Sequence, residues 1–289
     1  MSDRASVGHR VGTYLVLTFA FSSYFYFRII HAGTMRGGGG LWVAALMWCP
    51  AAAAIAASML TQRRLSAIGW RWSWRYVGLA YAIPLAYASV AYGATWALGL
   101  GRVPNPAFLA AIAGKLHLAS PGANVAGYLA LQATVGMVFS SLTALGEEIG
   151  WRGFLVPELA RAMPLAGVAV VSGVVWASWH VPVLLFADYH GATPSWYSLL
   201  CFSVLVLGAS FVLAWLRLRS GSVWPAVIFH ASHNLWIQTV FDPFTADTGR
   251  TAWIIGEFGA ALALTGAVAG WLAWRAGVDG FAAIARSAA

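Results

Sequence analysis

Long apolar stretches follow one another along almost the entire chain. Eight stretches, each about 20 residues long, reach the length that an α-helix needs to cross the hydrocarbon core of a bilayer. They are residues 11–30, 41–60, 76–98, 125–146, 164–187, 195–216, 222–240 and 252–274. Because lipid offers backbone groups no hydrogen-bond partner, a lipid-exposed segment of this kind must be helical. The sequence therefore predicts an all-α, polytopic membrane protein with about eight transmembrane helices.

The low content of charged residues agrees with this fold class. Only 9% of the residues are charged and 60% are hydrophobic, whereas a soluble domain carries about 25% charged residues. The net charge of +8 does not require a nucleic-acid partner, because the basic excess of a membrane protein usually lies in its cytoplasmic loops. The alternation of Trp and Arg over residues 70–75 suits the lipid headgroup layer. We therefore expect a lipid bilayer as partner and no nucleic acid.

The chain divides into three parts within a single integral membrane domain. Residues 1–124 hold the first three spans and their loops, residues 125–240 hold spans four to seven, and residues 241–289 hold the last span and a tail. Of the 17 Lys and Arg residues, 12 fall on the side of the two termini and 5 on the other side. The positive-inside rule then predicts a multi-pass protein of the cell membrane with both termini in the cytoplasm.

Ionisable residues are rare inside the predicted spans, and most of those present gather on three of them. They are Glu147 and Glu148 near the end of the fourth span, His180 in the fifth, and His230 and His233 in the seventh. A charged group near the centre of a spanning helix costs about 2.5–3.5 kcal/mol and persists mainly where it is paired or faces a polar cavity. This pattern predicts a functional site enclosed by spans four, five and seven.

Helix geometry places three of these residues at comparable levels. Spans four and five turn at residues 161–164, and at 1.5 Å per residue Glu147 and His180 each lie about 22–26 Å from that turn. On the same rule His230 lies about 17 Å from the start of its own helix, counted from Arg219. The three side chains can therefore meet in one cavity.

Spacing along each helix separates supporting roles from roles in a cavity. Glu148 and Arg152 are four residues apart with the acid first, which favours an ion pair that supports the segment. Glu147 projects about 100° away from Glu148 and is free to face a cavity. The same four-residue spacing pairs Trp176 with His180, and His230 with Asn234.

Two kinds of catalytic site can be built from these types of side chain. A glutamate and a histidine can hold and deprotonate a water molecule. A second histidine with an asparagine can then hydrogen-bond the oxyanion that forms when a carbonyl group is attacked. Alternatively, Glu147, His180 and His230 could bind Zn²⁺ and leave one position open for water or substrate. Both arrangements hydrolyse an amide, and the sequence leaves the choice between them open.

Separate structural roles for the same residues are the competing interpretation. A single histidine inside a membrane protein often only hydrogen-bonds a neighbouring helix. We expect this role for His233, because Asn234 already shares a helix face with His230. Glu257, early in the eighth span, is expected to lie near the membrane interface in contact with water. The combination of acids, histidines and asparagine on three helices favours a catalytic site over these separate roles.

Three motifs match a known protein family. They are Glu-Glu-Xaa-Xaa-Xaa-Arg from Glu147 to Arg152, Phe-Xaa-Xaa-Xaa-His with Trp176 in first place and His180 in last, and His-Xaa-Xaa-Xaa-Asn from His230 to Asn234. With this order and spacing, residues 143–237 resemble the CPBP (Abi) family of intramembrane proteases. That family includes type II CAAX prenyl endopeptidases and bacteriocin-processing or immunity proteins.

The resemblance implies an eight-helix membrane fold with a site open to the cytoplasm. It implies that Glu147 is the general base and that His180 helps to position the water. It also implies that His230 and Asn234 bind the oxyanion, with Glu148, Arg152 and Trp176 as supporting residues. Members of the family are described both as metalloproteases and as metal-free glutamate proteases, so Zn²⁺ stays an open cofactor.

The predicted function is that of an intramembrane endopeptidase acting on a peptide or membrane-protein substrate. The alternative is a non-catalytic membrane partner or a bacteriocin-immunity-type protein on the same fold. A transporter or proton relay is less favoured, because the spans show no inverted hydropathy symmetry. The Arg-rich, Lys-poor composition suggests a bacterial host, in which prenylated substrates are not expected.

Overall fold

The regular elements of the structure are helices, as the sequence predicts. The computed structural model describes the backbone of residues 3–287 and the side chains of residues 6–277. Within that part of the chain, the one β-type contact is an isolated bridge between Arg102 and Ala246. Six helices are long and apolar enough to cross a membrane, which confirms a polytopic membrane protein.

These six candidate spans coincide with the first six predicted ones. They cover Ser6–Ala32, Gly37–Leu60, Trp74–Ala97, Pro121–Ala160, Leu165–Phe186 and Ser195–Ser220. Five of them correspond to the helices α1 (Asp3–Ala32), α2 (Leu41–Leu60), α3 (Trp74–Ala97), α8 (Leu165–Phe186) and α9 (Ser195–Ser220). Short 3-10 turns precede α2 and α3, at Gly37–Gly40 and Leu65–Ile68.

The fourth span is one long helix whose hydrogen-bond pattern changes along its length. It begins after the short helix α4 (Pro106–Leu116). It then runs through α5 (Pro121–Leu131), a π-helical stretch (Gln132–Gly136), α6 (Met137–Glu148), a second π-helical stretch (Ile149–Leu155) and α7 (Val156–Ala160). π-helical turns occur frequently at functional sites. The second stretch follows Glu147 and Glu148 directly, so the change of pitch falls beside the predicted site.

The last two predicted spans differ from the structure. The seventh is α10 (Trp224–Asn234), continued by a π-helical stretch (Leu235–Phe241) and α11 (Asp242–Phe244). Its polar residues make it too polar to count among the six apolar candidate spans. The eighth begins later than predicted. A 3-10 turn (Thr251–Trp253) and a loop precede α12 (Ala260–Ser287). The prediction of helix from residue 252 is wrong because Gly256 adopts a φ of 76°, a turn conformation that favours glycine.

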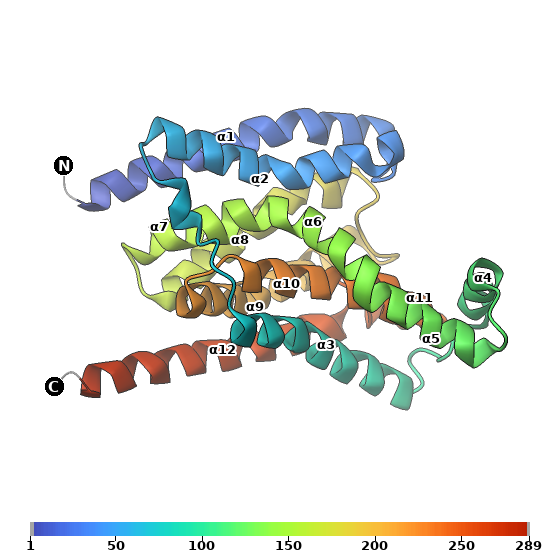
Figure 1. Cartoon of the computed structure of the whole chain (residues 1–289). Helices are drawn as coiled ribbons and strands as arrows, with labels where there is room; N and C mark the ends of the chain where they lie inside the picture. The colour runs from blue at the N-terminus through green and yellow to red at the C-terminus, as the bar shows by residue number, and fades with distance from the viewer. Residues whose placement is uncertain (1–2, 288–289) are drawn as a thin grey trace.

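The helices stack in layers around a buried centre. Figure 1 shows α1 and α2 paired along one side, α6, α8 and α10 through the middle, and α3 with α12 along the opposite side. α9 packs against both α8 and α12, α10 packs against α3 and α6, and α2 packs against α6. The middle layer, which carries the predicted site, is thus covered by helices on both sides. α4 and α5 pack together and project from one end of the bundle (Figure 1).

Both termini lie at the same end of the bundle (Figure 1). A buried ion cluster around Glu158 of α7 joins three segments of the chain. Glu158 of α7 is 3% exposed. Its carboxylate accepts hydrogen bonds from Arg10 at 3.1 Å and from Arg63 at 2.8 Å. Burial lowers the pKa of the Arg63 guanidinium, and the charge of Glu158 opposes that shift. The cluster ties α1 and the loop after α2 to α7, the helix that follows the site segment in the chain.

At the other end, Asp188 connects two loops that border the site. Its carboxylate accepts hydrogen bonds from the Thr34 hydroxyl, at 2.8 Å, and from the Met35 backbone N–H. Met35 and Tyr189 both line the central cavity described below. The aspartate therefore fixes the loop between α1 and α2 against the loop between α8 and α9.

Candidate active site

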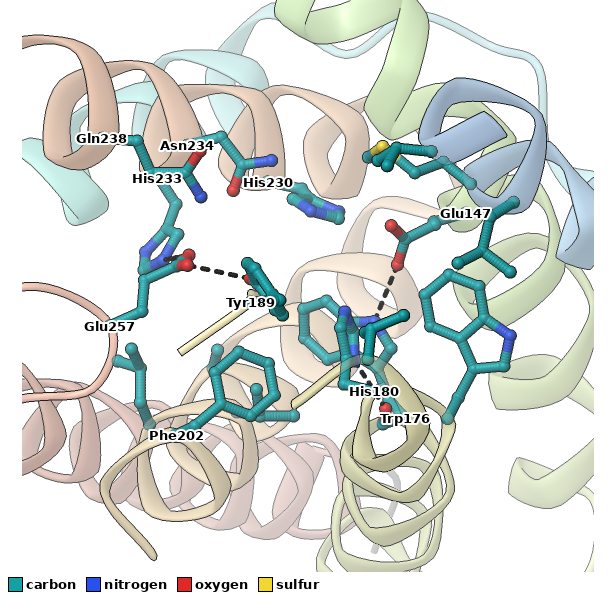
Figure 2. A pocket seen from close by; sticks show the side chains of 18 of the residues that line it. Glu147, Trp176, His180, Tyr189, Phe202, His230, His233, Asn234, Gln238 and Glu257 are labelled. Carbon is teal, nitrogen blue, oxygen red and sulfur yellow. Dashed lines mark hydrogen bonds and ion pairs between the residues drawn. The ribbon is translucent and has the colours of Figure 1, made fainter. Parts of the chain in front are cut away.

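A cavity of about 290 Å³ lies inside the bundle, bordered by α2, α6, α8, α9 and α10. Its lining contains all four residues predicted to be catalytic, namely Glu147, His180, His230 and Asn234. Figure 2 shows their side chains arranged around one space. The predicted enclosure by spans four, five and seven is confirmed, and residues of α2 and α9 complete the wall.

Close packing against α2 holds the segment that carries Glu147. A Cβ atom on Gly150 would lie 2.5 Å from the Cβ of Pro50. A Cβ atom on Gly146 would lie 2.7 Å from the Met47 carbonyl oxygen. Both contacts are too short for a real side chain, so glycine is needed on each side of the acid for the two backbones to approach.

The Glu147 carboxylate is buried and is held through one of its two oxygens. The residue is 2% exposed. The indole N–H of Trp176 donates to its Oε2 at 2.8 Å, and that of Trp151 donates to the same oxygen at 3.3 Å. Its Oε1 has no hydrogen-bond partner among the described residues. Oε1 is therefore the oxygen that can bind a water molecule in the cavity.

Glu148 faces away from the cavity and makes the predicted ion pair. Arg152 Nη1 donates to its two carboxylate oxygens at 2.9 and 3.2 Å, and both side chains are fully buried. Nδ1 of His230 lies 2.9 Å from Glu148 Oε1. A buried carboxylate beside an arginine stays charged, so it accepts the hydrogen bond and Nδ1 carries a proton. Glu148 thus orients the His230 ring as well as pairing with Arg152.

Arg152 is fixed by contacts on several sides. Its guanidinium carbon lies 4.2 Å from the centre of the Trp176 ring, a cation–π contact. Its backbone carbonyl accepts a hydrogen bond from Arg217 Nε at 2.8 Å. Arg217 also donates to the carbonyls of Ala67 and Ile68 in the loop before α3. These bonds hold the π-helical stretch in place behind the cavity.

His180 is oriented by its own helix and by aromatic rings. Its Nδ1 lies 2.9 Å from the Trp176 carbonyl oxygen. A carbonyl can only accept, so Nδ1 donates, and in the neutral ring Nε2 is left as an acceptor. The rings of Trp179 and Phe202 pack edge-on against the imidazole, each with centroids 4.9 Å away. The predicted packing of Trp176 beside His180 is also confirmed, at 5.9 Å.

His230 and Asn234 lie one helical turn apart on α10 and both line the cavity, as their spacing predicts. The Trp176 ring packs edge-on against His230 with centroids 5.4 Å apart. The side chain of Asn234 makes no hydrogen bond with any described residue, so its amide is free to bind a ligand. The cavity is therefore lined by a carboxylate from α6, an imidazole from α8, and an imidazole and an amide from α10.

Comparison with known proteins agrees with the motifs. The family model "Type II CAAX prenyl endopeptidase Rce1-like" matches residues 128–236. These residues form an Rce1-like domain. CAAX prenyl protease 2 of Methanococcus maripaludis is 33% identical over 100 residues, which are 32% of this chain and 36% of that relative. The match thus spans about a third of the relative's length. The Rce1-like domain contains every residue predicted for the site.

No metal-binding group is preformed in the described part of the Rce1-like domain. Among the described residues of the whole chain, no three His, Cys, Asp or Glu side chains are grouped so that they could hold a metal ion. Oε2 of Glu147 is occupied by two indoles, and Nδ1 of both His180 and His230 is hydrogen-bonded. A metal-ligating histidine usually hydrogen-bonds through its other ring nitrogen. Nε2 of both rings and Oε1 of Glu147 have no partner among the described residues, so Zn²⁺ stays an open cofactor, and no catalytic step below uses a metal.

A second polar cluster lines the cavity, and part of it lies outside the Rce1-like domain. Nε2 of His233 lies 2.9 Å from Glu257 Oε1, and the Tyr189 hydroxyl donates to Glu257 Oε2 at 2.9 Å. Tyr87 on α3 hydrogen-bonds Nδ1 of His233. Glu257 is 6% exposed. The expectation that Glu257 is in contact with bulk water is therefore wrong, because the loop before α12 folds inward onto the cavity.

The sequence analysis did not identify Tyr87, Tyr189 or Glu257 as site residues. The two tyrosines lie in stretches where aromatic residues are common and carry no motif. His233 and Glu257 are 24 residues apart, on a helix and a loop, so no helical periodicity relates them. The sequence offers one signal for Glu257, an acidic residue in an apolar stretch directly after Gly256.

Proposed function

We propose that this chain is an intramembrane endopeptidase in which Glu147 activates water to attack a peptide carbonyl. One observation supports the proposal above the others. The cavity inside an apolar bundle is lined by the carboxylate of Glu147, two imidazoles and a free amide. The Rce1-like domain adds that the matched family is one of proteases.

The geometry of Glu147 suits a general base. Both indoles bind Oε2, which leaves Oε1 to accept a proton from a water molecule. Nε2 of His180 can accept the second hydrogen of the same water and so fix its direction. The attack forms a bond between the water oxygen and the carbonyl carbon, and the proton moves to Glu147. That proton is then available to the amine that leaves.

His230 and Asn234 would stabilise the oxyanion. The Asn234 amide can donate directly. The hydrogen bond from Nδ1 to Glu148 orients the His230 ring, which can donate from Nε2 in its imidazolium form. Removing one oxyanion donor typically slows an enzyme by about 10²–10³-fold, which is the expected effect of Asn234→Ala.

The proposed substrate is a peptide or a segment of a membrane protein, because the cavity lies inside a bundle of apolar helices. We further propose that the protein spans the cell membrane with both termini in the cytoplasm. The proposed scheme routes no step through a metal, so it predicts that activity is unchanged by a chelator. Metal analysis of the purified protein checks this expectation independently.

The test is cleavage of a membrane-peptide library by the purified protein in nanodiscs, read by mass spectrometry. His180→Ala and Asn234→Ala proteins should fold but lose most cleavage. Retained cleavage by a Glu147→Ala protein would contradict the proposal. If a biological activity such as immunity survives simultaneous replacement of Glu147, His180 and His230, the non-catalytic partner role is supported instead.

A further inference from the structure

The cavity has a second acidic end, opposite Glu147. Figure 2 shows Glu257 and His233 on one side of the space and Glu147 on the other, with Tyr189 between them. The second end is not part of the three motifs, and Glu257 lies beyond the matched residues 128–236. The catalytic scheme above leaves this end without a role.

Hydrogen bonding fixes the charge of the second end. The Tyr87 hydroxyl has no partner other than Nδ1 of His233 among the described residues, so a buried hydroxyl proton is satisfied only by donation to Nδ1. His233 is then the neutral ring that donates from Nε2 to Glu257. Tyr189 donates to the other carboxylate oxygen. Because both oxygens accept, the Glu257 carboxyl group is ionised and carries a full negative charge.

No fixed positive charge in the cavity balances this acid. The described residues that line the cavity include two carboxylates, Glu147 and Glu257, and neither lysine nor arginine. Arg152 is committed to Glu148 behind the wall. A buried charge without a partner is costly, so a cation that enters the cavity gains a strong charge-assisted hydrogen bond at Glu257. A free carboxylate would meet no such partner.

One part of the cavity wall is apolar. Phe202, Leu205 and Val206 of α9 and Phe229 of α10 line it. An apolar wall beside a fixed charge suits a group with an apolar body and a cationic end. Tyr189, His233 and Gln238 hydrogen-bond the Glu257 carboxylate. Its two oxygens offer about four acceptor positions, so an ammonium or amidinium group can still bind.

We propose that Glu257 and His233 form a subsite that binds a cationic group of the substrate, a lysine or arginine side chain or an N-terminal ammonium. The subsite rests on the proposed peptidase function for its role in selecting substrates. Glu257 would be the residue that contacts the cation, and Tyr189 and His233 would be positioning residues that hold the carboxylate.

The first test compares two ring compounds of the same shape, benzamidine and benzamide, on the full chain in nanodiscs. Binding is followed by the fluorescence of tryptophan, since Trp176 and Trp179 line the cavity. The cation should bind at least about tenfold more tightly, the effect of one charge-assisted hydrogen bond. Equal binding of the two compounds would overturn the proposal without any variant being made.

Variants then locate the binding site. Glu257→Gln should reduce benzamidine affinity by about tenfold or more and leave benzamide unaffected. Asp247→Asn, which neutralises an exposed acid away from the cavity, is the matched control and should change neither. Should Glu257→Gln fail to fold, Tyr189→Phe keeps the acid but no longer holds its Oε2 in place, so it should weaken benzamidine binding and leave benzamide unaffected. Loss of the preference in Asp247→Asn, or its persistence in Glu257→Gln, would contradict the assignment.

Competition against benzamidine distinguishes the two sources of the cation. N-acetyl-lysine amide presents a side-chain ammonium, and leucine amide presents a chain-end ammonium. The better competitor identifies the source, and competition by neither would overturn the subsite. These are binding measurements, so they can succeed even if Glu147→Gln leaves cleavage intact and the peptidase proposal fails.

Discussion

Trp176 connects the three functional groups of the site. Its indole N–H donates to Glu147, its ring covers the guanidinium of Arg152, and it packs edge-on against His230. The family motif usually has Phe at this position, and Trp adds a donor that Phe lacks. The departure from the motif therefore gives Glu147 its shortest hydrogen bond.

Replacing Trp176 by Phe should slow catalysis without unfolding the protein. The ring contacts stay, while the 2.8 Å hydrogen bond to Glu147 is lost. A hydrogen bond to a charged group is worth about 1.5–3 kcal/mol, so kcat/KM should fall by roughly 10- to 100-fold. Trp196→Phe, at a residue that is 65% exposed, is the control and should be unchanged. Peptide cleavage rates measure both, and a Trp176→Phe rate within twofold of wild type would contradict this role.

Side-chain contacts between residues of the same helix were predictable from the sequence. The helical repeat of 3.6 residues per turn predicts that Glu148 pairs with Arg152 and that Trp176 packs beside His180. It also predicts that the Glu147 side chain points away from Glu148. Contacts between distant segments were not predictable in this way. Glu257 reaches His233 because a loop folds inward, and the sequence analysis placed that loop inside a helix. The buried cluster at Glu158 was missed because two of its arginine partners, Arg10 and Arg63, come from other parts of the chain.

At the scale of elements, the long fourth helix determines where the acids sit. α6 ends at Glu148 and the π-helical stretch Ile149–Leu155 follows. Helix α2 crosses this junction so closely that the glycines at 146 and 150 have no room for a side chain. Hydropathy predicted the position of the span over residues 125–146 but not its continuation to Ala160, and the π-helical change of pitch depends on these tertiary contacts.

A methyl group at Gly150 should disturb this junction. In Gly150→Ala, the new Cβ would lie 2.5 Å from Pro50, so helices must shift. Overpacking of this kind costs about 1–3 kcal/mol in the free energy of unfolding. Gly93→Ala in α3 is the matched control, because no heavy atom lies within 4 Å of its Cβ. The control should be neutral or more stable by up to about 1 kcal/mol. Equal unfolding midpoints for the two variants in detergent would contradict the packing argument.

At the scale of the whole molecule, the charge pattern and the fold agree about the two ends of the bundle. Both termini lie at one end (Figure 1). Without the buried Arg152, 11 of the other 16 Lys and Arg residues were assigned to that side. The hydropathy pattern predicted the first six spans but not the late start of α12, because the turn at Gly256 interrupts an otherwise apolar run.

Reporter fusions test the proposed orientation. Green fluorescent protein fused to the C-terminus should fluoresce, and alkaline phosphatase at the same place should be inactive, because both reporters would be cytoplasmic. Phosphatase inserted at Gly249, an exposed position at the other end, should be active. The reverse pattern of activities would contradict the positive-inside assignment.

In the proposed mechanism, Glu147 removes a proton from the attacking water. Glu147→Gln keeps the shape and can still meet the two indoles, but it cannot accept the proton. General base catalysis typically contributes about 10²–10⁴-fold. We therefore predict that the rate of peptide cleavage by folded Glu147→Gln protein in nanodiscs falls by that factor, while Asp247→Asn keeps the wild-type rate. Cleavage by Glu147→Gln within tenfold of the wild-type rate would contradict the account.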